Sequence, residues 1–336
     1  MPDPARRRVA LLATGGTIAG QPHAAGPGYR PGVLDAAALA AAVPGLAELA
    51  DLRAETLASL GSQNLGLETW LRLAARIREL AAAGRADGIV VTHGTDTLEE
   101  TAYFLNLVLA PGLPLVLTGA MRPAGAPGAD GPANLRDAVA VAADPAAAGR
   151  GALVVMNGAI HGARDVAKTS ASALCAFASP NRGPLGAVAG GQPLFHAPPV
   201  PPPARQDGFP PAWQALEAAG LPRVDILYAH ADQPADIVPW LVQRGCRGIV
   251  LAGVGAGNAA DGVAAALAQA GRQGVAVVRA SRTGSGQVAR NVEIDDDALG
   301  FIAARDLTPQ KARILLALAL LAGKQGQDLQ RCFDRY

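Results

Sequence analysis

Short apolar segments, several of them continuously apolar, alternate with helical patterns along this 336-residue chain. The apolar segments predict strands at residues 9–13, 88–91, 114–117, 152–156, 224–228, 248–251 and 275–279. The helical patterns lie at residues 35–43, 68–82, 98–109, 134–143, 235–244, 262–270 and 308–321. Such alternation predicts parallel sheets with helices on both faces, and strands without polar residues are typical of sheets covered on both sides. The predicted fold class is therefore α/β, with mostly parallel sheets flanked by helices.

Proline is concentrated between residues 190 and 222, in Pro198-Pro199, Pro201-Pro202-Pro203 and Pro210-Pro211. Proline lacks a backbone N–H and fixes φ, so this density predicts an extended linker. We predict two domains joined by this Pro-rich linker: an N-terminal α/β domain at residues 1–196, the linker at 197–221, and a smaller C-terminal α/β domain at 222–336.

Composition argues against several classes of partner. Half of the chain is hydrophobic and the formal net charge is +1, which supports a sizeable core and gives no electrostatic reason to expect nucleic-acid binding. The longest apolar run, residues 314–322, is too short to span a bilayer, so no membrane partner is expected. Three scattered cysteines suggest neither a disulfide framework nor a metal site.

The N-terminus carries Arg6, Arg7 and Arg8 before only a few apolar residues. Because this segment lacks the long apolar stretch of a signal peptide, the sequence as given predicts a cytoplasmic protein. Removal of an export signal from a periplasmic protein would leave the same pattern.

Two predicted strands run directly into turns rich in glycine and threonine. Residues 14–20 follow the first strand, and residues 92–97 follow the second. The carboxyl edge of an open α/β sheet is where such proteins bind ligands. Thr17 and Thr95 offer hydroxyl nucleophiles there and Asp96 offers a carboxylate, which favours hydroxyl-based covalent catalysis. The alternative for Thr17 is a turn in which its hydroxyl bonds to nearby backbone, and Thr14 is expected to be structural.

Asp96 and Lys168 each have a structural alternative. Asp96 and Glu99 fit a capping box for the helix predicted to begin near residue 98. The chain contains only three lysines among 29 basic residues, so a retained lysine would mark a place that requires an amine able to lose its proton, which arginine cannot replace. The alternative for Lys168 is a solvated surface side chain.

No cofactor or metal is predicted. Residues 253–258 are glycine-rich but lack the G-x-G-x-x-G spacing of dinucleotide loops. The five histidines show no metal-binding spacing and are expected to be structural. Ser62 and Gln63 could bind a carboxylate or an amide, or simply close a turn.

Taken together, residues 14–20, 61–63 and 93–101 resemble the bacterial type II L-asparaginase family, which includes the glutaminase-asparaginases. The resemblance continues in order to the C-terminus, through residues 119–123, 129–135, 164–169 and 309–313. It implies hydrolysis of L-asparagine to L-aspartate and ammonia. Thr17 matches the first threonine nucleophile and Tyr29 matches the tyrosine of a mobile lid, while Thr95, Asp96 and Lys168 match a second catalytic cluster.

The resemblance also implies a substrate-binding set, namely Ser62, Gln63, Thr95, Asp96, Ala120, Asn258 and Glu293. Ala120 would contribute its backbone carbonyl near the scissile amide. Asn258 and Glu293 would come from the smaller domain of a neighbouring subunit, because the family forms homotetramers of close dimers with sites between subunits.

Several positions depart from the family pattern. Asn64 replaces an aspartate and Ala256 replaces an asparagine, and the lid segment at residues 21–30 has its own glycine and proline pattern. Selectivity between asparagine and glutamine is therefore open, so a broad glutaminase-asparaginase is one alternative. A D-aspartyl or tRNA-dependent amidase relative is another, although the near-neutral charge disfavours the tRNA version. A third is a non-catalytic amino-acid sensor.

Overall fold

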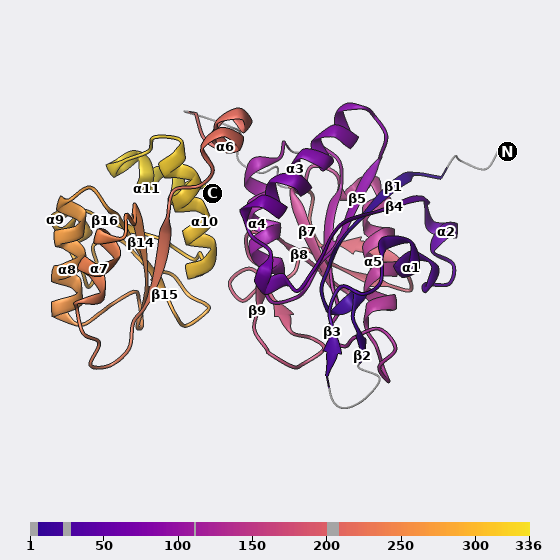
Figure 1. Cartoon of the computed structure of the whole chain (residues 1–336), viewed down its shortest axis with the longest axis horizontal. Coiled ribbons are helices and arrows are strands. Elements are labelled where there is room, and N and C mark those ends of the chain that lie inside the picture. Colours follow the sequence, from indigo (N-terminus) through magenta and orange to yellow (C-terminus); the bar gives the residue numbers. More distant parts are fainter. Residues whose placement is uncertain (1–5, 23–27, 111, 200–207) are drawn as a thin grey trace. The chain divides into compact units, whose positions relative to one another are not determined.

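The computed structural model describes residues 6–22, 28–110, 112–199 and 208–336 (Figure 1). The chain divides into two compact units, residues 1–202 and residues 203–336.

In the described part of unit 1, the large sheet has eight strands in the order β12-β11-β8-β7-β6-β5-β1-β4. Their bounds are β1 (Arg8–Gly15), β4 (Asp51–Leu60), β5 (Gly88–Thr92), β6 (Leu115–Thr118), β7 (Ala152–Met156), β8 (Ala159–Gly162), β11 (Gly186–Ala189) and β12 (Gln192–Phe195). The five strands from β4 to β7 in this order are parallel, whereas β8, β11 and β12 continue the sheet in antiparallel fashion. Apart from Arg8 at the start of β1, the central strands are buried along their whole length, as continuous apolar runs require.

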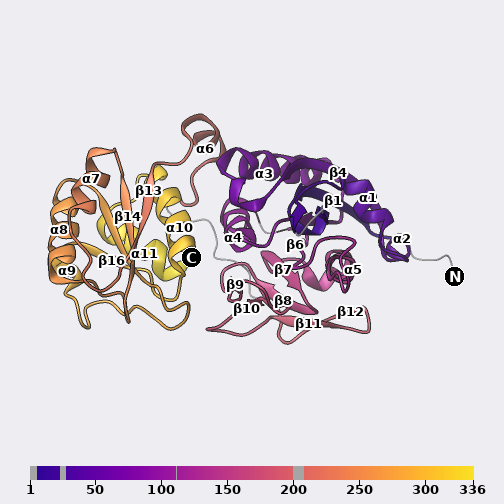
Figure 2. The ribbon, with the colours of Figure 1, turned by 60° about the horizontal axis from the view of Figure 1, so that its bottom comes forward.

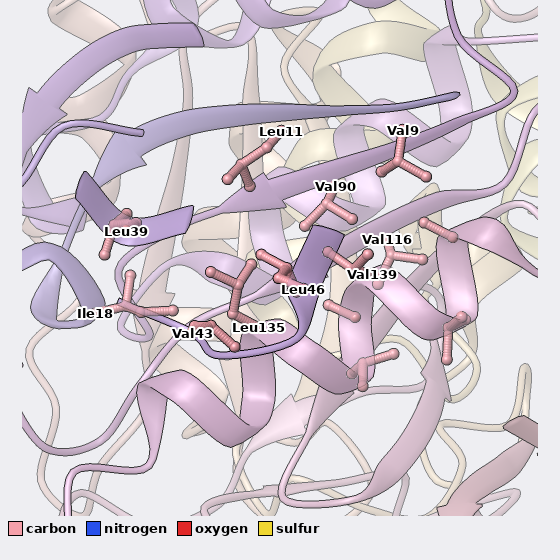
Figure 3. Packing of buried hydrophobic residues seen from close by; sticks show 14 of the residues in the cluster. Val9, Leu11, Ile18, Leu39, Val43, Leu46, Val90, Val116, Leu135 and Val139 are labelled. Atoms are coloured by element: carbon pink, nitrogen blue, oxygen red, sulfur yellow. The ribbon is translucent and has the colours of Figure 1, made fainter. Parts of the chain in front are cut away.

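Helices cover both faces of this sheet. They are α1 (Ala36–Ala41), α2 (Leu46–Leu49), α3 (Leu67–Ala82), α4 (Leu98–Val108) and α5 (Gly131–Ala143). Figure 1 shows α3 and α4 on one side and α1, α2 and α5 on the other. On the second side, strand residues such as Val9, Val90 and Val116 pack against Leu46 and Leu135 from the helices (Figure 3). This packing fixes where each strand ends and therefore where the turns after β1 and β5 begin.

Short elements complete unit 1. They are the 3₁₀ turns η1 (Thr17–Ala19), η2 (Ser62–Asn64) and η3 (Pro145–Ala147), and the strand pairs β2 (Gln21–Pro22) with β3 (Tyr29–Arg30) and β9 (Ala167–Lys168) with β10 (Phe177–Ala178).

Unit 2 has a parallel sheet in the order β13-β14-β15-β16, formed by β13 (Val224–Tyr228), β14 (Gly248–Gly253), β15 (Ala276–Ser281) and β16 (Phe301–Ala303). Its helices are α6 (Trp213–Ala219), α7 (Ile237–Gln243), α8 (Asp261–Arg272), α9 (Asp296–Leu299), α10 (Pro309–Leu321) and α11 (Gly326–Arg335). Figures 1 and 2 show α7, α8 and α9 on one side of this sheet and α10 and α11 on the other. The predicted α/β fold class with mostly parallel sheets is confirmed.

The described part of the predicted linker includes a helix. Residues 200–207, which include Pro201-Pro202-Pro203, lie outside the described residues. Residues 213–219 form helix α6, so the prediction of an extended chain is wrong there, because alanine, leucine, glutamine and glutamate follow the last proline pair and favour helix. Phe209 is buried and its ring centroid lies 4.6 Å from that of Tyr336, so this stretch packs on unit 2.

Candidate active site

The turns that follow β1 and β5 leave the sheet at the same edge and touch. The two strands are parallel neighbours, with Ala13 opposite Thr92. The Thr14 hydroxyl donates to the carbonyl of Thr92 at 2.9 Å, which confirms its structural role. A Cβ placed on Gly16, whose φ is +80°, would lie 2.3 Å from the Cα of Gly94. Glycine is therefore required where the two turns touch. This contact brings together the turns that carry the predicted nucleophiles Thr17 and Thr95.

Thr17 is buried and begins η1, directly after the contact between the two turns. Its Oγ1 lies 2.7 Å from the Oη of Tyr29, which belongs to β3. The Tyr29 ring packs against Gly20, since a Cβ on that glycine would lie 2.7 Å from Cδ2 of the ring. A second oxygen held at hydrogen-bond distance from a hydroxyl is the arrangement that proton removal needs. Residues 23–27 of the predicted lid lie outside the described residues.

Lys168 joins the second cluster from β9. Its Nζ donates to Thr95 Oγ1 at 2.9 Å and to Asp96 Oδ1 at 2.6 Å. Thr95 is buried, and the Lys168 side chain is 15% exposed against 64% for Asp96. The amine is thus largely withdrawn from water while the carboxylate remains open to a ligand, so Lys168 is not the solvated surface lysine of the alternative interpretation.

The capping-box interpretation of Asp96 and Glu99 is wrong. Helix α4 has Thr97 as its N-cap, and the Thr97 hydroxyl donates to the carbonyl of Ser62 at 2.8 Å. Asp96 binds Lys168 instead, and the buried Glu99 accepts the backbone N–H of Lys168 at 2.7 Å. Both carboxylates therefore serve the strand that carries the lysine, a contact between segments about seventy residues apart that sequence spacing could not reveal.

Three of the predicted substrate-binding residues surround the second turn. Ser62 lies in η2 and is buried. A Cβ placed on Gly94 would lie 2.7 Å from the Oγ of Ser62. Gln63 is exposed beside it, and Ala120 is fully buried in the turn after β6. A Cβ on Gly119, directly before Ala120, would lie 3.2 Å from Cγ2 of Thr95. The structure therefore gathers these segments around Thr95.

His93 supports this turn from within the core. The Trp70 indole N–H donates to the hydroxyl of Thr101, which lies 2.9 Å from Nε2 of His93, while Nδ1 lies 2.7 Å from the carbonyl of Gly94. Because the carbonyl of Gly94 can only accept, Nδ1 carries the ring proton and donates it to Gly94, and Nε2 accepts the proton of the Thr101 hydroxyl. Burial lowers the pKa of His93 from 6.5 to about 4, which keeps the ring neutral. The structural role expected for this histidine holds.

The remaining two predicted residues meet in unit 2. Asn258 follows β14 and Glu293 lies between β15 and α9, and Asn258 Nδ2 donates to Glu293 Oε2. Glu293 is exposed, so its carboxylate is open to a ligand.

Within the described ranges, no group of three or more His, Cys, Asp or Glu side chains is arranged to hold a metal ion. Among the same residues, no helix combines the length and apolar character needed to cross a membrane.

Comparison with protein families covers nearly the whole chain. Residues 8–201 match the model described as Asparaginase, N-terminal, and residues 223–333 match the Glutaminase/Asparaginase C-terminal domain. The resemblance drawn from the sequence motifs is confirmed.

Individual relatives of the chain carry names from the same family. The chain is 42% identical to the Probable L-asparaginase periplasmic of Haemophilus influenzae and to L-asparaginase 2 of Escherichia coli, over 98% of this chain and 93% of each relative. It is 41% identical to the Glutaminase-asparaginase of Pseudomonas fluorescens, over 98% of this chain and 90% of the relative. The crystal structure of a Probable Cytoplasmic L-asparaginase from Campylobacter jejuni matches with a TM-score of 0.89 and 42% identity, covering 98% of this chain and all of that one.

Proposed function

This chain belongs to the asparaginase family, and on that basis we propose that it is an L-asparaginase, an amidohydrolase that converts L-asparagine into L-aspartate and ammonia. The observation that carries this proposal is the presence of two separate hydroxyl clusters at one sheet edge. Thr17 contacts Tyr29, and Thr95 contacts Lys168. Two hydroxyls, each in contact with a group that can take up a proton, suit a reaction with an acylation half and a deacylation half.

In the first half, Tyr29 relays a proton: its Oη accepts the proton of Thr17 as its own phenolic proton moves toward the amide nitrogen, and Thr17 Oγ1 attacks the amide carbon of the substrate. The carbon–nitrogen bond then breaks, the proton is passed to the nitrogen, and ammonia leaves. The aspartyl group remains as an ester on Thr17. Backbone N–H groups of the two touching turns would stabilise the oxyanion that forms on the carbonyl.

In the second half, Thr95 and Lys168 orient and activate the water that attacks the ester. The carbon–oxygen bond to Thr17 breaks, aspartate is released, and Thr17 regains its proton. Glu99 supports this step indirectly, because it holds the backbone of Lys168 in place.

Charged and polar groups of the protein would recognise the substrate's α-ammonium, α-carboxylate and amide groups. The carboxylates of Asp96 and Glu293 would pair with the α-ammonium group, and Ser62 and Gln63 would bind the α-carboxylate. The carbonyl of Ala120 would accept a hydrogen bond from the scissile amide. Following the family, we propose a homotetramer of close dimers.

In that tetramer, Asn258 and Glu293 complete the site of a neighbouring subunit. Their mutual hydrogen bond supports this proposal, since it holds an exposed carboxylate at a defined place.

A second candidate is a broad glutaminase-asparaginase, because a relative with that name is 41% identical over nearly the whole chain. The same residues would act on a substrate one methylene longer. A non-catalytic sensor is less well supported, because binding alone does not require Thr17–Tyr29 and Thr95–Lys168 pairs.

One steady-state experiment tests all three candidates. Ammonia release is measured with L-asparagine and with L-glutamine, and the ratio of the two kcat/KM values is compared. A high ratio supports the L-asparaginase, and a ratio near one supports the broader enzyme. Binding of either amino acid without ammonia release would leave only the sensor. Mass spectrometry of the rapidly quenched enzyme should locate the aspartyl adduct on Thr17, and an adduct on another residue would overturn the assigned nucleophile.

A further inference from the structure

A buried ion pair lies beneath the Asn258–Glu293 contact in unit 2. Arg279 on β15 binds Asp296, with Nε 2.6 Å from Oδ1 and Nη2 2.7 Å from Oδ2. Their side chains are 1% and 0% exposed. Removing two charges from water costs free energy that apolar residues of similar size would not cost. Stability alone therefore does not account for a pair buried this deeply.

The guanidinium of Arg279 also holds the loop that carries Asn258. Its Nη1 donates to the carbonyls of Ala256 at 3.1 Å and Gly257 at 3.4 Å, the two residues directly before Asn258. The loop is closed on itself by reciprocal backbone hydrogen bonds between Val254 and Asn258. Arg279 thus fixes the outer half of a closed turn against the sheet.

The same ion pair holds the segment that carries Glu293. Arg279 Nη2 donates to the carbonyl of Ala289 at 3.2 Å, and Asp296 Oδ2 accepts the backbone N–H of Asn291 at 2.9 Å. Glu293 lies between these two anchors and Asp296 itself. One ion pair therefore connects both segments whose side chains meet at Asn258 and Glu293.

The donor geometry explains why arginine occupies this position. A guanidinium has five N–H donors in a rigid plane, and Arg279 uses them on Asp296, Ala256, Gly257 and Ala289. Lysine has three donors on a flexible stem and could not reach both segments at once.

We propose that Arg279 and Asp296 are positioning residues, which hold Asn258 and Glu293 in the arrangement that recognises the α-ammonium group of the substrate. This inference rests on the proposed function, in which Glu293 pairs with that group. Neither residue of the ion pair touches substrate. They act through the two loops alone.

The test compares two substrates on the same preparations. L-asparagine carries the α-ammonium group, whereas succinamate is the same molecule without it. The variants are Arg279→Lys, which keeps the charge but loses the planar fork, and Asp296→Asn, which keeps the shape but loses the charge. The control is Arg223→Lys, which alters an exposed pair with Asp225 at the start of β13, away from both loops.

Both variants should lower kcat/KM for L-asparagine by about ten- to a hundredfold, mainly through KM, as expected when a charge-assisted contact is misplaced. Succinamate turnover should fall far less, so the ratio of the two kcat/KM values should drop. A merely structural role would reduce both substrates equally by lowering the active fraction, and the ratio would stay at the wild-type value.

The outcomes separate the two proposals. An unchanged ratio in both variants, with active wild-type enzyme, overturns the positioning role and leaves the proposed function intact. A wild-type enzyme that releases no ammonia from L-asparagine overturns the proposed function. Because the ratio does not depend on how much protein folds, a destabilised variant still gives an answer.

Discussion

The hydroxyl oxygens of Thr17 and Tyr29 lie 2.7 Å apart, although Thr17 starts a 3₁₀ turn after β1 and Tyr29 sits on the short strand β3. The tyrosine is held there by the backbone of Gly20, which has no side chain to push the ring away. The side chains proposed as nucleophile and proton acceptor are thus in contact in this fold.

Replacing Tyr29 with phenylalanine keeps the ring and removes only the oxygen that faces Thr17. We expect kcat for L-asparagine to fall by about 10²- to 10⁴-fold, the range typical of losing a general base, with little change in stability. Steady-state ammonia release measures the effect. Tyr228→Phe, which removes an exposed hydroxyl on β13, is the matched control and should behave as wild type. Near-normal turnover by Tyr29→Phe would remove the tyrosine from the mechanism.

The Thr95–Lys168 contact predicts a defect in the second half of the reaction. In Thr95→Val, ammonia should appear in a rapid burst equal to the number of sites, followed by slow turnover, because acylation proceeds while the ester persists. Rapid-quench measurements of ammonia and aspartate separate the two steps. Equal slowing of both products, without a burst, would contradict the assignment.

Two substitutions, one that removes the charge of Lys168 and one that keeps it, test the role of this side chain. Lys168→Met should lower kcat by about 10²- to 10⁴-fold, and Lys168→Arg should be almost as inactive because arginine cannot give up its proton. The comparison is made by steady-state kinetics at a single pH. If Lys168→Arg retained most of the activity, a positive charge alone would be sufficient.

The contact between the turns after β1 and β5 predicts that a side chain at position 94 would not fit. A Cβ there would lie 2.7 Å from Ser62 Oγ and 3.1 Å from the Cα of Gly16, so Gly94→Ala should separate the turns. We expect a loss of about 1–3 kcal/mol in the free energy of unfolding and a larger loss of activity. Urea unfolding and kinetics measure the two effects.

Gly262→Ala is the control for this variant. Its Cβ would meet only Ala235 at 4.0 Å, an ordinary contact, in the first turn of α8. That change should be neutral or slightly stabilising, since alanine favours helix more than glycine does. If Gly94→Ala had the stability and activity of this control, a side chain would fit between the turns and the prediction would be wrong.

His93 predicts a pH dependence of stability. Its pKa is lowered to about 4 in the folded protein, from 6.5 in the unfolded chain. Above pH 6.5 both states carry a neutral ring. Between pH 6.5 and 4 only the unfolded state takes up the proton, so the free energy of unfolding should fall by about 3 kcal/mol as the pH drops through this window.

The contribution of His93 is isolated by subtracting the profile of His93→Gln, which does not titrate, from that of the wild type. Urea unfolding across pH 4 to 7 provides both profiles. The difference should slope through this window and flatten above it. Parallel profiles would mean that His93 binds protons equally in both states.

In the large sheet, the sequence predicted the central strands β1, β5, β6 and β7 and missed β4 at one end and β8, β11 and β12 at the other. Runs such as that of β5 are apolar throughout, so they could be recognised as strands without any partner. Strand β4 mixes exposed and half-buried residues without regular alternation, and β12 contains Pro193, so neither stands out locally. Their pairing with β1 and β11 defines them, and that pairing exists only in the folded sheet.

For the site, the chain by itself determined that threonine-rich turns follow two buried strands and that its motifs match one enzyme family. Only the tertiary structure decided which group each polar side chain contacts. Glu99 binds the backbone of Lys168, and Arg279 spans two loops. The reason is physical: the spacing of apolar residues encodes burial locally, whereas the partner of a buried charge is whichever group the fold brings within about 3 Å.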